Sequence, residues 1–212
     1  MRSPRANRIT AKPTFAVVVD GETEVWYLQM LKRNERAISV NVEPKIPQRK
    51  KLKDQYDAVL SLSEDYTKVF WIVDLDVLIS ETRLSRAGVL TPIQELINYK
   101  NDIEGKYNNI VLIVNNPCLE FWLLLHFEKT TKLFNTCEEA QVQLKKHLKN
   151  YEKSQGYFTK QDNDIYLQLK SNVINALGNA KSTGEFDEND PYKAVSEMHL
   201  FFEASEFNQL FG

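Results

Sequence analysis

Apolar residues along the chain fall into short continuous runs that alternate with segments of helical spacing. Three strong runs cover residues 15–19, 69–73 and 110–114, and a weaker run covers residues 38–42. Short apolar runs rich in β-branched and aromatic residues are typical of strands that are buried on both faces. We therefore predict a mainly parallel sheet with three strong strands and one weak strand.

The segments between these runs have the apolar spacing of helices. Thr23 is expected to cap a helix after the first run, and Thr91 followed by Pro92 predicts a second helix start. The helices expected in this half cover residues 23–31, 52–62, 92–106 and the segment after the turn in NNPCLEFWLLLHF, whereas residues 77–90 are expected to be irregular. This alternation favours an α/β fold with helices on both faces of the sheet.

Beyond Cys137 the pattern is helical throughout, with helices expected over residues 140–148, 165–177 and 192–202. The predicted organisation has three parts. These are a flexible basic tail over residues 1–13, an α/β domain over residues 14–130, and a helical extension over residues 131–212 that packs on the core.

The composition describes a globular chain of 212 residues, with 42% hydrophobic and 11% aromatic residues. Its two cysteines, Cys118 and Cys137, exclude a disulfide framework and a four-thiolate zinc site, and they suit a reducing cytosol. Filling of the core would explain either cysteine. The apolar runs are too short to span a bilayer, and the first residues lack a signal peptide pattern, so a cytoplasmic protein is expected.

The net charge of −2 conceals an uneven distribution along the chain. Residues 1–53 carry a net charge of +7 and the remainder carries −9. Arg49, Lys50, Lys51 and Lys53 are the best candidates to contact a nucleic-acid backbone. A solvated basic surface is the stronger alternative for such a run.

Acidic residues follow two of the predicted strands. Asp20 and Glu24 come after the first strand, and Asp74 and Asp76, two apart on a nearly extended segment, come after the strand at 69–73. If the two strands are neighbours, four carboxylates converge at the ligand-binding edge of the sheet. Their repulsion would be relieved by Mg²⁺ or Mn²⁺, since hard oxygen ligands without nearby histidine or thiolate favour these ions.

Simpler explanations exist for each acid taken alone. Carboxylates in the first turn of a helix are stabilised by its dipole, which is enough to explain Glu22 and Glu24, and we leave Glu22 outside the predicted site. Aspartate after a strand is also a common turn residue. The placement of both acidic groups at the ends of buried strands favours metal binding over these alternatives.

The segments VVVDGETEVWYLQML, VFWIVDLD and NNPCLEFWLLLHF resemble the three motifs of RloB-like proteins, a bacterial phage-defence family of the Toprim superfamily. The resemblance implies a Toprim core with a Rossmann-like sheet that binds Mg²⁺. By position, Asp20 and Glu24 match the acids of the first motif, and Asp74 and Asp76 match the Asp-x-Asp pair. Family members more usually have Glu where this chain has Asp20.

The third motif resembles the Asn-Pro-x-x-Glu-x-Trp segment of the same family. The resemblance implies that Asn116, Glu120 and His126 lie near the active site, with Glu120 as a further catalytic residue. The helix dipole offers an alternative explanation for Glu120. His126 lies roughly 120° from Glu120 around a helix, so a core or interface histidine is the preferred interpretation.

The function predicted from these motifs is metal-dependent hydrolysis of phosphodiester bonds in DNA or RNA. The resemblance implies an effector of anti-phage defence that acts with an AAA-type ATPase partner, which must be a separate chain because no Walker motif occurs here. Two alternatives remain. One is a degenerate Toprim module that binds nucleic acid or a protein without cleavage, and the other is a phosphatase of the haloacid-dehalogenase type, suggested by WIVDLDVLI.

Overall fold

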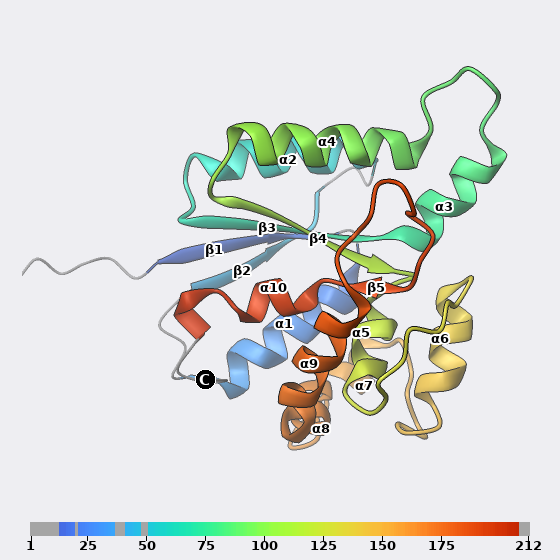
Figure 1. Ribbon diagram of the computed structural model, residues 1–212. Helices are drawn as coiled ribbons and strands as arrows, with labels where there is room; N and C mark the ends of the chain where they lie inside the picture. Colours follow the sequence, from blue (N-terminus) through green and yellow to red (C-terminus); the bar gives the residue numbers. More distant parts are fainter. Residues whose placement is uncertain (1–12, 20, 37–40, 48–50, 208–212) are drawn as a thin grey trace, which may run out of the picture.

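A single five-stranded sheet organises the molecule, as the computed structural model in Figure 1 shows. The structure describes residues 13–19, 21–36, 41–47 and 51–207. The strands lie in the order β2-β1-β3-β4-β5, and all neighbours are parallel except β4 and β5. Their bounds are β1 Thr14–Val18, β2 Asn41–Lys45, β3 Lys68–Asp74, β4 Ile110–Asn116 and β5 Val195–Ser196. The prediction of a mainly parallel α/β fold is confirmed.

Helices cover both faces of this sheet (Figure 1). The α-helices are α1 Glu22–Asn34, α2 Leu52–Ser63, α3 Leu75–Leu84, α4 Pro92–Lys106, α5 Leu119–Leu125, α6 Cys137–Leu144, α7 Gln155–Phe158, α8 Ile165–Leu169, α9 Val173–Thr183 and α10 Met198–Phe202. Two short 3₁₀ turns, η1 Lys170–Asn172 and η2 Ser205–Phe207, complete the described elements. Helices α2 and α4 lie on one face, and α1, α5 and α10 lie on the other.

The alternation of side chains along β1 explains why two hydrophobic cores form. Phe15 and Val17 point into the core shared with α1 and α5, while Ala16 and Val18 point into the core beneath α2 and α4. Successive residues of a strand project to opposite faces, so a strand covered on both faces needs apolar residues at every position.

Helix starts differ from the predictions in two places. The cap of α1 is Gly21 and not Thr23, so α1 begins closer to the strand than expected. Residues 77–90, predicted to be irregular, include most of α3, which continues to Leu84 before a loop leads into α4. The Thr91 cap of α4 is confirmed, with its side chain accepting from the Gln94 amide.

The C-terminal region contains a strand that the helical pattern did not predict. β5 pairs antiparallel with the end of β4 and is followed by Glu197, whose carboxylate accepts from the backbone amides of Val114 (2.9 Å) and Phe186 (2.8 Å). The prediction of a helix over residues 192–202 is therefore wrong in its first half. The helix predicted over 165–177 is divided into α8, η1 and α9, and α7 was not predicted.

Contacts with α1 hold the C-terminal helices against the sheet region. Asp164 is fully buried at the start of α8 and accepts from Arg33 (2.6 Å) and Asn34 (2.9 Å). Tyr166 donates to Glu35 at 2.9 Å. One continuous core includes side chains from β1, α1 and α5 and from α8, α9 and α10. Among the described residues, no helix is long and apolar enough to cross a membrane.

Candidate metal centre at the end of β1 and β3

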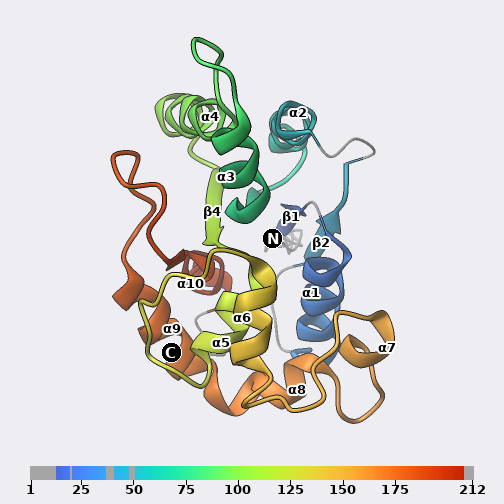
Figure 2. The ribbon, with the colours of Figure 1, turned by 90° about the vertical axis from the view of Figure 1, so that its right-hand side faces the viewer.

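A pocket of about 520 Å³ lies at the end of the sheet where β1 and β3 finish. Figure 2 views this end of the sheet, where α1, α3 and α6 supply residues that line the pocket. The described residues that line the pocket are Gly21, Glu22, Thr23, Glu24, Trp26, Ile46, Asp74, Asp76, Val77, Cys118, Cys137 and Lys153. Three of the predicted metal ligands therefore share one pocket, together with Glu22, which the sequence analysis left outside the site.

Glu24 lies in the first turn of α1 and is 3% exposed. Its Oε2 accepts a hydrogen bond from the Thr23 hydroxyl at 3.3 Å. A Cβ atom placed on Gly21 would lie 2.4 Å from the same oxygen, which shows that the carboxylate folds back over the helix cap. The absence of a side chain at Gly21 leaves the space that this conformation needs. Asp20, the other predicted acid of this motif, lies outside the described residues.

Asp74 ends β3 and is held by β4 and α5. Its Oδ2 accepts from the Leu119 backbone amide at 3.2 Å, and its Oδ1 accepts from the Asn115 side chain at 3.4 Å. Asp76 lies in the first turn of α3, where its Oδ1 contacts the Val77 amide at 2.8 Å. The assumption that both aspartates lie on one extended segment is wrong, because the helix begins between them, yet both reach the pocket.

The backbone of the third motif forms hydrogen bonds with the backbone of the second motif. The Pro117 carbonyl accepts from the amides of Leu75 at 3.0 Å and Asp76 at 3.1 Å, the first two residues of α3. These bonds satisfy amides that a helix start would otherwise leave unpaired. The loop after β4 therefore fixes the direction in which α3 leaves the sheet, and with it the position of Asp76.

Glu120 lies beside the pocket and is not among its lining residues. It is fully buried in the first turn of α5, and its Oε1 accepts from the Tyr151 hydroxyl at 2.9 Å. The Lys153 ammonium lies 3.2 Å from the same oxygen, and Gln141 donates to it at 3.4 Å. Burial and the charge of Glu120 raise the pKa of Tyr151, which keeps the phenol protonated as a donor. Glu120 is therefore already engaged by groups from the helical extension.

Cys118 and Cys137 form a disulfide at the wall of the pocket. The bond joins the cap of α5 to the first residue of α6, across 19 positions of sequence. The inference of a reducing compartment from cysteine usage loses its support, because the two residues are paired. With two cysteines only one pairing is possible, but the sequence does not tell whether they approach each other; the packing of α5 on α6 brings them together.

Lys153 and Tyr151 were not predicted as site residues. They lie on the loop between α6 and α7, and Lys153 lines the pocket while Tyr151 anchors the loop by packing on Tyr157 and Phe158. No local motif in the sequence marks either residue. Their role depends on how the extension folds back on the sheet, which periodicity does not reveal.

Asn116 and His126 do not line the pocket. Asn116 is buried and donates to the Lys193 carbonyl at 2.8 Å, and its neighbour Asn115 is the residue that contacts Asp74. His126 is 2% exposed, and its Nδ1 contacts the Trp122 carbonyl at 3.0 Å. Burial lowers the pKa of His126 to about 4, so the ring is neutral at pH 7. The interpretation of His126 as a core histidine agrees with this burial.

A second groove, of about 660 Å³, shares Asp74 with the pocket. Lys51 and Lys53 are among its lining residues, and Lys53 also pairs with Asp57 at 2.8 Å. The other two predicted nucleic-acid contacts, Arg49 and Lys50, lie outside the described residues. Two of the four basic candidates therefore lie on a surface that leads to the acidic pocket.

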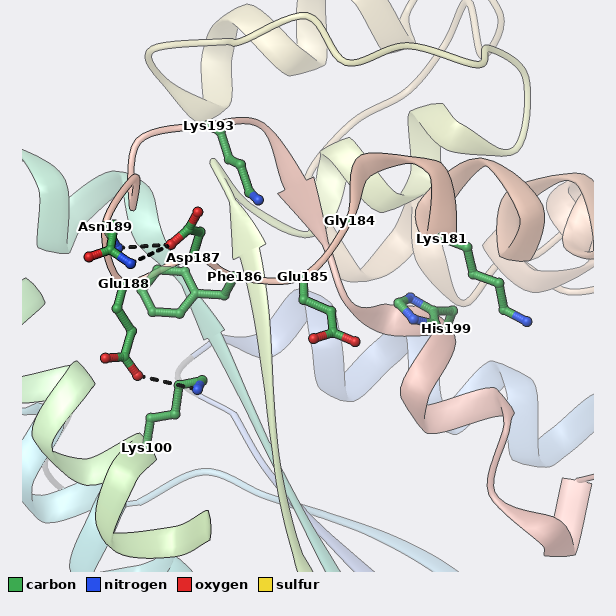
Figure 3. Close-up of a pocket in the computed structure, with 10 residues that line it drawn as sticks. All are labelled: Lys100, Lys181, Gly184, Glu185, Phe186, Asp187, Glu188, Asn189, Lys193 and His199. Atoms are coloured by element: carbon green, nitrogen blue, oxygen red, sulfur yellow. Dashed lines mark hydrogen bonds and ion pairs between the residues drawn. The ribbon is translucent and has the colours of Figure 1, made fainter.

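Another pocket, of about 800 Å³, lies elsewhere, beneath the loop that precedes β5 (Figure 3). Lys100 pairs there with Glu188 at 3.3 Å, and Asp187 accepts from the Asn189 amide at 2.9 Å. The charges lining this pocket are mixed in sign and partly paired with one another. It contains none of the predicted site residues.

The chemistry of the donor set decides which metal would suit the pocket. Glu24, Asp74 and Asp76 offer hard carboxylate oxygens, and the pocket has no described histidine, which fits Mg²⁺ or Mn²⁺. The tightest group of possible ligands in the described chain is a different one, Cys118, Glu120 and Cys137. Its two sulfurs are bonded to each other, and Lys153 lies beside its carboxylate, so this second group does not suit a cation.

Comparison with known families finds a match over most of the chain. The family described as RloB-like protein matches residues 15–204, which include the three motifs and nearly all of the described fold. No curated protein and no solved structure shows a significant match. The family match extends well past the α/β region and includes the loop between α6 and α7 that carries Tyr151 and Lys153. The chain therefore belongs to the RloB-like family.

Proposed function

We propose that the protein is a metal-dependent nuclease that hydrolyses phosphodiester bonds of DNA or RNA. One observation carries the proposal: Glu24, Asp74 and Asp76 line a single pocket at the ends of two adjacent parallel strands. Carboxylates that share a pocket at this edge of an open sheet are suited to a divalent cation and an anionic ligand. Membership of the RloB-like family supports the same assignment.

In this proposal Glu24, Asp74 and Asp76, with Asp20, hold Mg²⁺ or Mn²⁺. A bound dication would polarise the phosphate and lower the pKa of a coordinated water. The hydrogen bonds that Asp74 accepts from Leu119 and Asn115 fix its carboxylate before substrate arrives. Lys51 and Lys53 attract the nucleic-acid backbone along the groove that shares Asp74.

The resemblance of the three motifs to RloB-like proteins also supports a proposal for the biological role. We propose that the nuclease is an effector of anti-phage defence whose activity is controlled by a separate AAA-type ATPase chain. Co-purification of the two chains, and cleavage that depends on ATP hydrolysis by the partner, would test this role.

The central experiment compares wild type with Asp74→Ala in cleavage of supercoiled plasmid and of tRNA, each with Mg²⁺ and with Mn²⁺. We expect metal-dependent cleavage by wild type and at least about a 100-fold loss in the variant, because a ligand of the reacting centre is removed. Asp65→Ala changes an exposed aspartate at a turn and serves as the matched control with unchanged activity. Cleavage that persists in Asp74→Ala would contradict the assignment.

A second candidate is a module that binds nucleic acid or protein without cleavage. One observation favours this candidate. Among the described residues, the carboxylate oxygens of Glu24, Asp74 and Asp76 do not form a group in which all three lie within 4.8 Å of one another. Binding of DNA or tRNA without cleavage under any metal condition would support this candidate. Release of phosphate from a small phosphoester, with both nucleic acids intact, would instead support a phosphatase.

A further inference from the structure

Lys153 is the one basic side chain among the described residues that line the acidic pocket. It comes from the loop between α6 and α7, far in sequence from Glu24 and Asp74. Tyr151, two residues earlier, is 2% exposed and fixes the loop through its hydroxyl bond to Glu120. The loop therefore brings a positive charge to the pocket from an anchored backbone.

The surroundings of Lys153 keep it charged. Burial lowers its pKa, but the carboxylates of Glu120, Glu24 and Asp74 raise it by more, so the pKa lies above its ordinary value. At neutral pH the side chain is an ammonium with three donors. Lys153 lines the same pocket as Glu24 and Asp74, so its charge faces both predicted metal ligands.

Neutralising the buried Glu120 is the simpler role for Lys153, but that carboxylate has other partners. Tyr151 and Gln141 both donate to Glu120. The Lys153 side chain is 43% exposed, in contrast to the fully buried Glu120 side chain it pairs with. A long, half-exposed side chain with spare donors can turn toward an anion in the pocket while Glu120 keeps its remaining hydrogen bonds.

We propose that Lys153 is a catalytic residue whose ammonium contacts a non-bridging oxygen of the phosphodiester bound at Glu24, Asp74 and Asp76. The inference rests on the proposed nuclease function and extends it, because it makes the helical extension part of the active site. A positive charge at this oxygen stabilises the negative charge that develops as the phosphate is attacked.

The test uses the full chain and three variants. Lys153→Met removes the charge at similar length, Lys153→Arg keeps it, and Lys145→Met changes an exposed lysine of the same extension as a control. We expect Lys153→Met to lower kcat by about 100-fold or more with KM changed by less than threefold, since one stabilising contact is lost in the transition state. Lys153→Arg should retain activity within about tenfold, and Lys145→Met should match wild type.

A measurement independent of turnover separates this role from a structural one. Mn²⁺ binding, measured by titration calorimetry, should become tighter by about fivefold in Lys153→Met, because a positive charge next to the cation is removed. Unchanged kcat in Lys153→Met overturns the inference. It is also overturned if the variant binds Mn²⁺ more weakly and melts at a lower temperature, which is the result expected of a purely structural residue.

The outcomes also distinguish the inference from the function on which it rests. If wild type cleaves neither plasmid nor tRNA, the proposed nuclease function fails and the inference falls with it. If wild type cleaves and Lys153→Met cleaves equally well, the inference alone fails.

Discussion

Gly21 and Glu24 illustrate how a single missing side chain shapes the pocket. A Cβ atom at Gly21 would approach Glu24 Oε2 to 2.4 Å, although the backbone of Gly21, with φ of −122°, is accessible to any residue. The glycine is therefore not required by its backbone conformation. Its consequence is local, because it permits the carboxylate to fold back toward the end of β1.

We expect Gly21→Ala to weaken metal binding while leaving the fold intact. The added methyl group displaces the flexible end of Glu24 and does not clash with backbone. Mn²⁺ affinity should fall by about tenfold or more, whereas the melting temperature without metal should stay the same or rise slightly, since alanine restricts the unfolded chain.

Gly105→Ala is the matched control for this substitution. Gly105 lies within α4, and an added Cβ there would meet no atom within 4 Å. It should raise stability through helix propensity and leave Mn²⁺ affinity unchanged. Equal Mn²⁺ affinity in Gly21→Ala and wild type would show that Glu24 is not a ligand.

At the scale of elements, the disulfide ties the start of α6 to the start of α5. Both sulfurs lie at the wall of the acidic pocket, and the bond closes a loop that includes the whole of α5. A crosslink of this kind reduces the conformational freedom of the unfolded chain. The starts of α5 and α6 are therefore held together by a covalent bond as well as by apolar packing.

We expect Cys137→Ser to lower the free energy of unfolding by about 3 kcal/mol under non-reducing conditions, the size typical of a loop of roughly 20 residues. Reductant should destabilise wild type by a similar amount in urea denaturation. The double variant with serine at both positions should not respond to reductant. A wild-type midpoint that is the same with and without reductant would mean that the thiols are unpaired in solution.

The strongly periodic elements could be predicted from sequence because their burial is decided locally. The strands at β1, β3 and β4 and the capped helix α4 follow from apolar runs and from Thr91 with Pro92. Helix α3 was missed because its pattern, with Val77 and Leu84 exposed, does not present one clean apolar face. β5 was missed because two residues that pair with β4 have no period to detect.

At the scale of the whole molecule, hydrogen bonds between α1 and the start of α8 join the helical extension to the α/β region. Asp164 caps α8 by accepting from the Leu167 amide at 3.0 Å and also accepts from Arg33 and Asn34. This one buried carboxylate links the helical extension to the first helix of the α/β region. The boundary predicted near residue 130 is crossed by these bonds and by a shared core.

We expect Asp164→Ala to lower the free energy of unfolding by about 2–3 kcal/mol, because a helix cap and two hydrogen bonds to a buried carboxylate are lost together. The urea transition should remain single, with far-UV circular dichroism and tryptophan fluorescence coincident, if extension and sheet unfold together. Asp57→Ala removes an exposed pair with Lys53 and should lower the free energy of unfolding far less than Asp164→Ala does. Two separate transitions in Asp164→Ala would instead indicate two independent domains.

In the candidate site, too, some residues can be predicted from local sequence patterns and others cannot. Glu24, Asp74 and Asp76 could be predicted because each follows a strand whose end is easy to locate. Lys153 and Asn115 could not be, since Lys153 reaches the pocket only through the folding of the extension, and Asn115 depends on the register of β4 against β3. Residues supplied by distant segments become visible only with the tertiary structure.

The two edge strands of the sheet restrict how this molecule can associate with others. β2 carries Pro44 between Glu43 and Lys45, and β5 is only two residues long. Proline lacks the amide needed for further pairing, and charged or very short border strands discourage it. Polymerisation by strand addition is therefore disfavoured. We expect a partner chain to recognise side chains on the helices and loops instead.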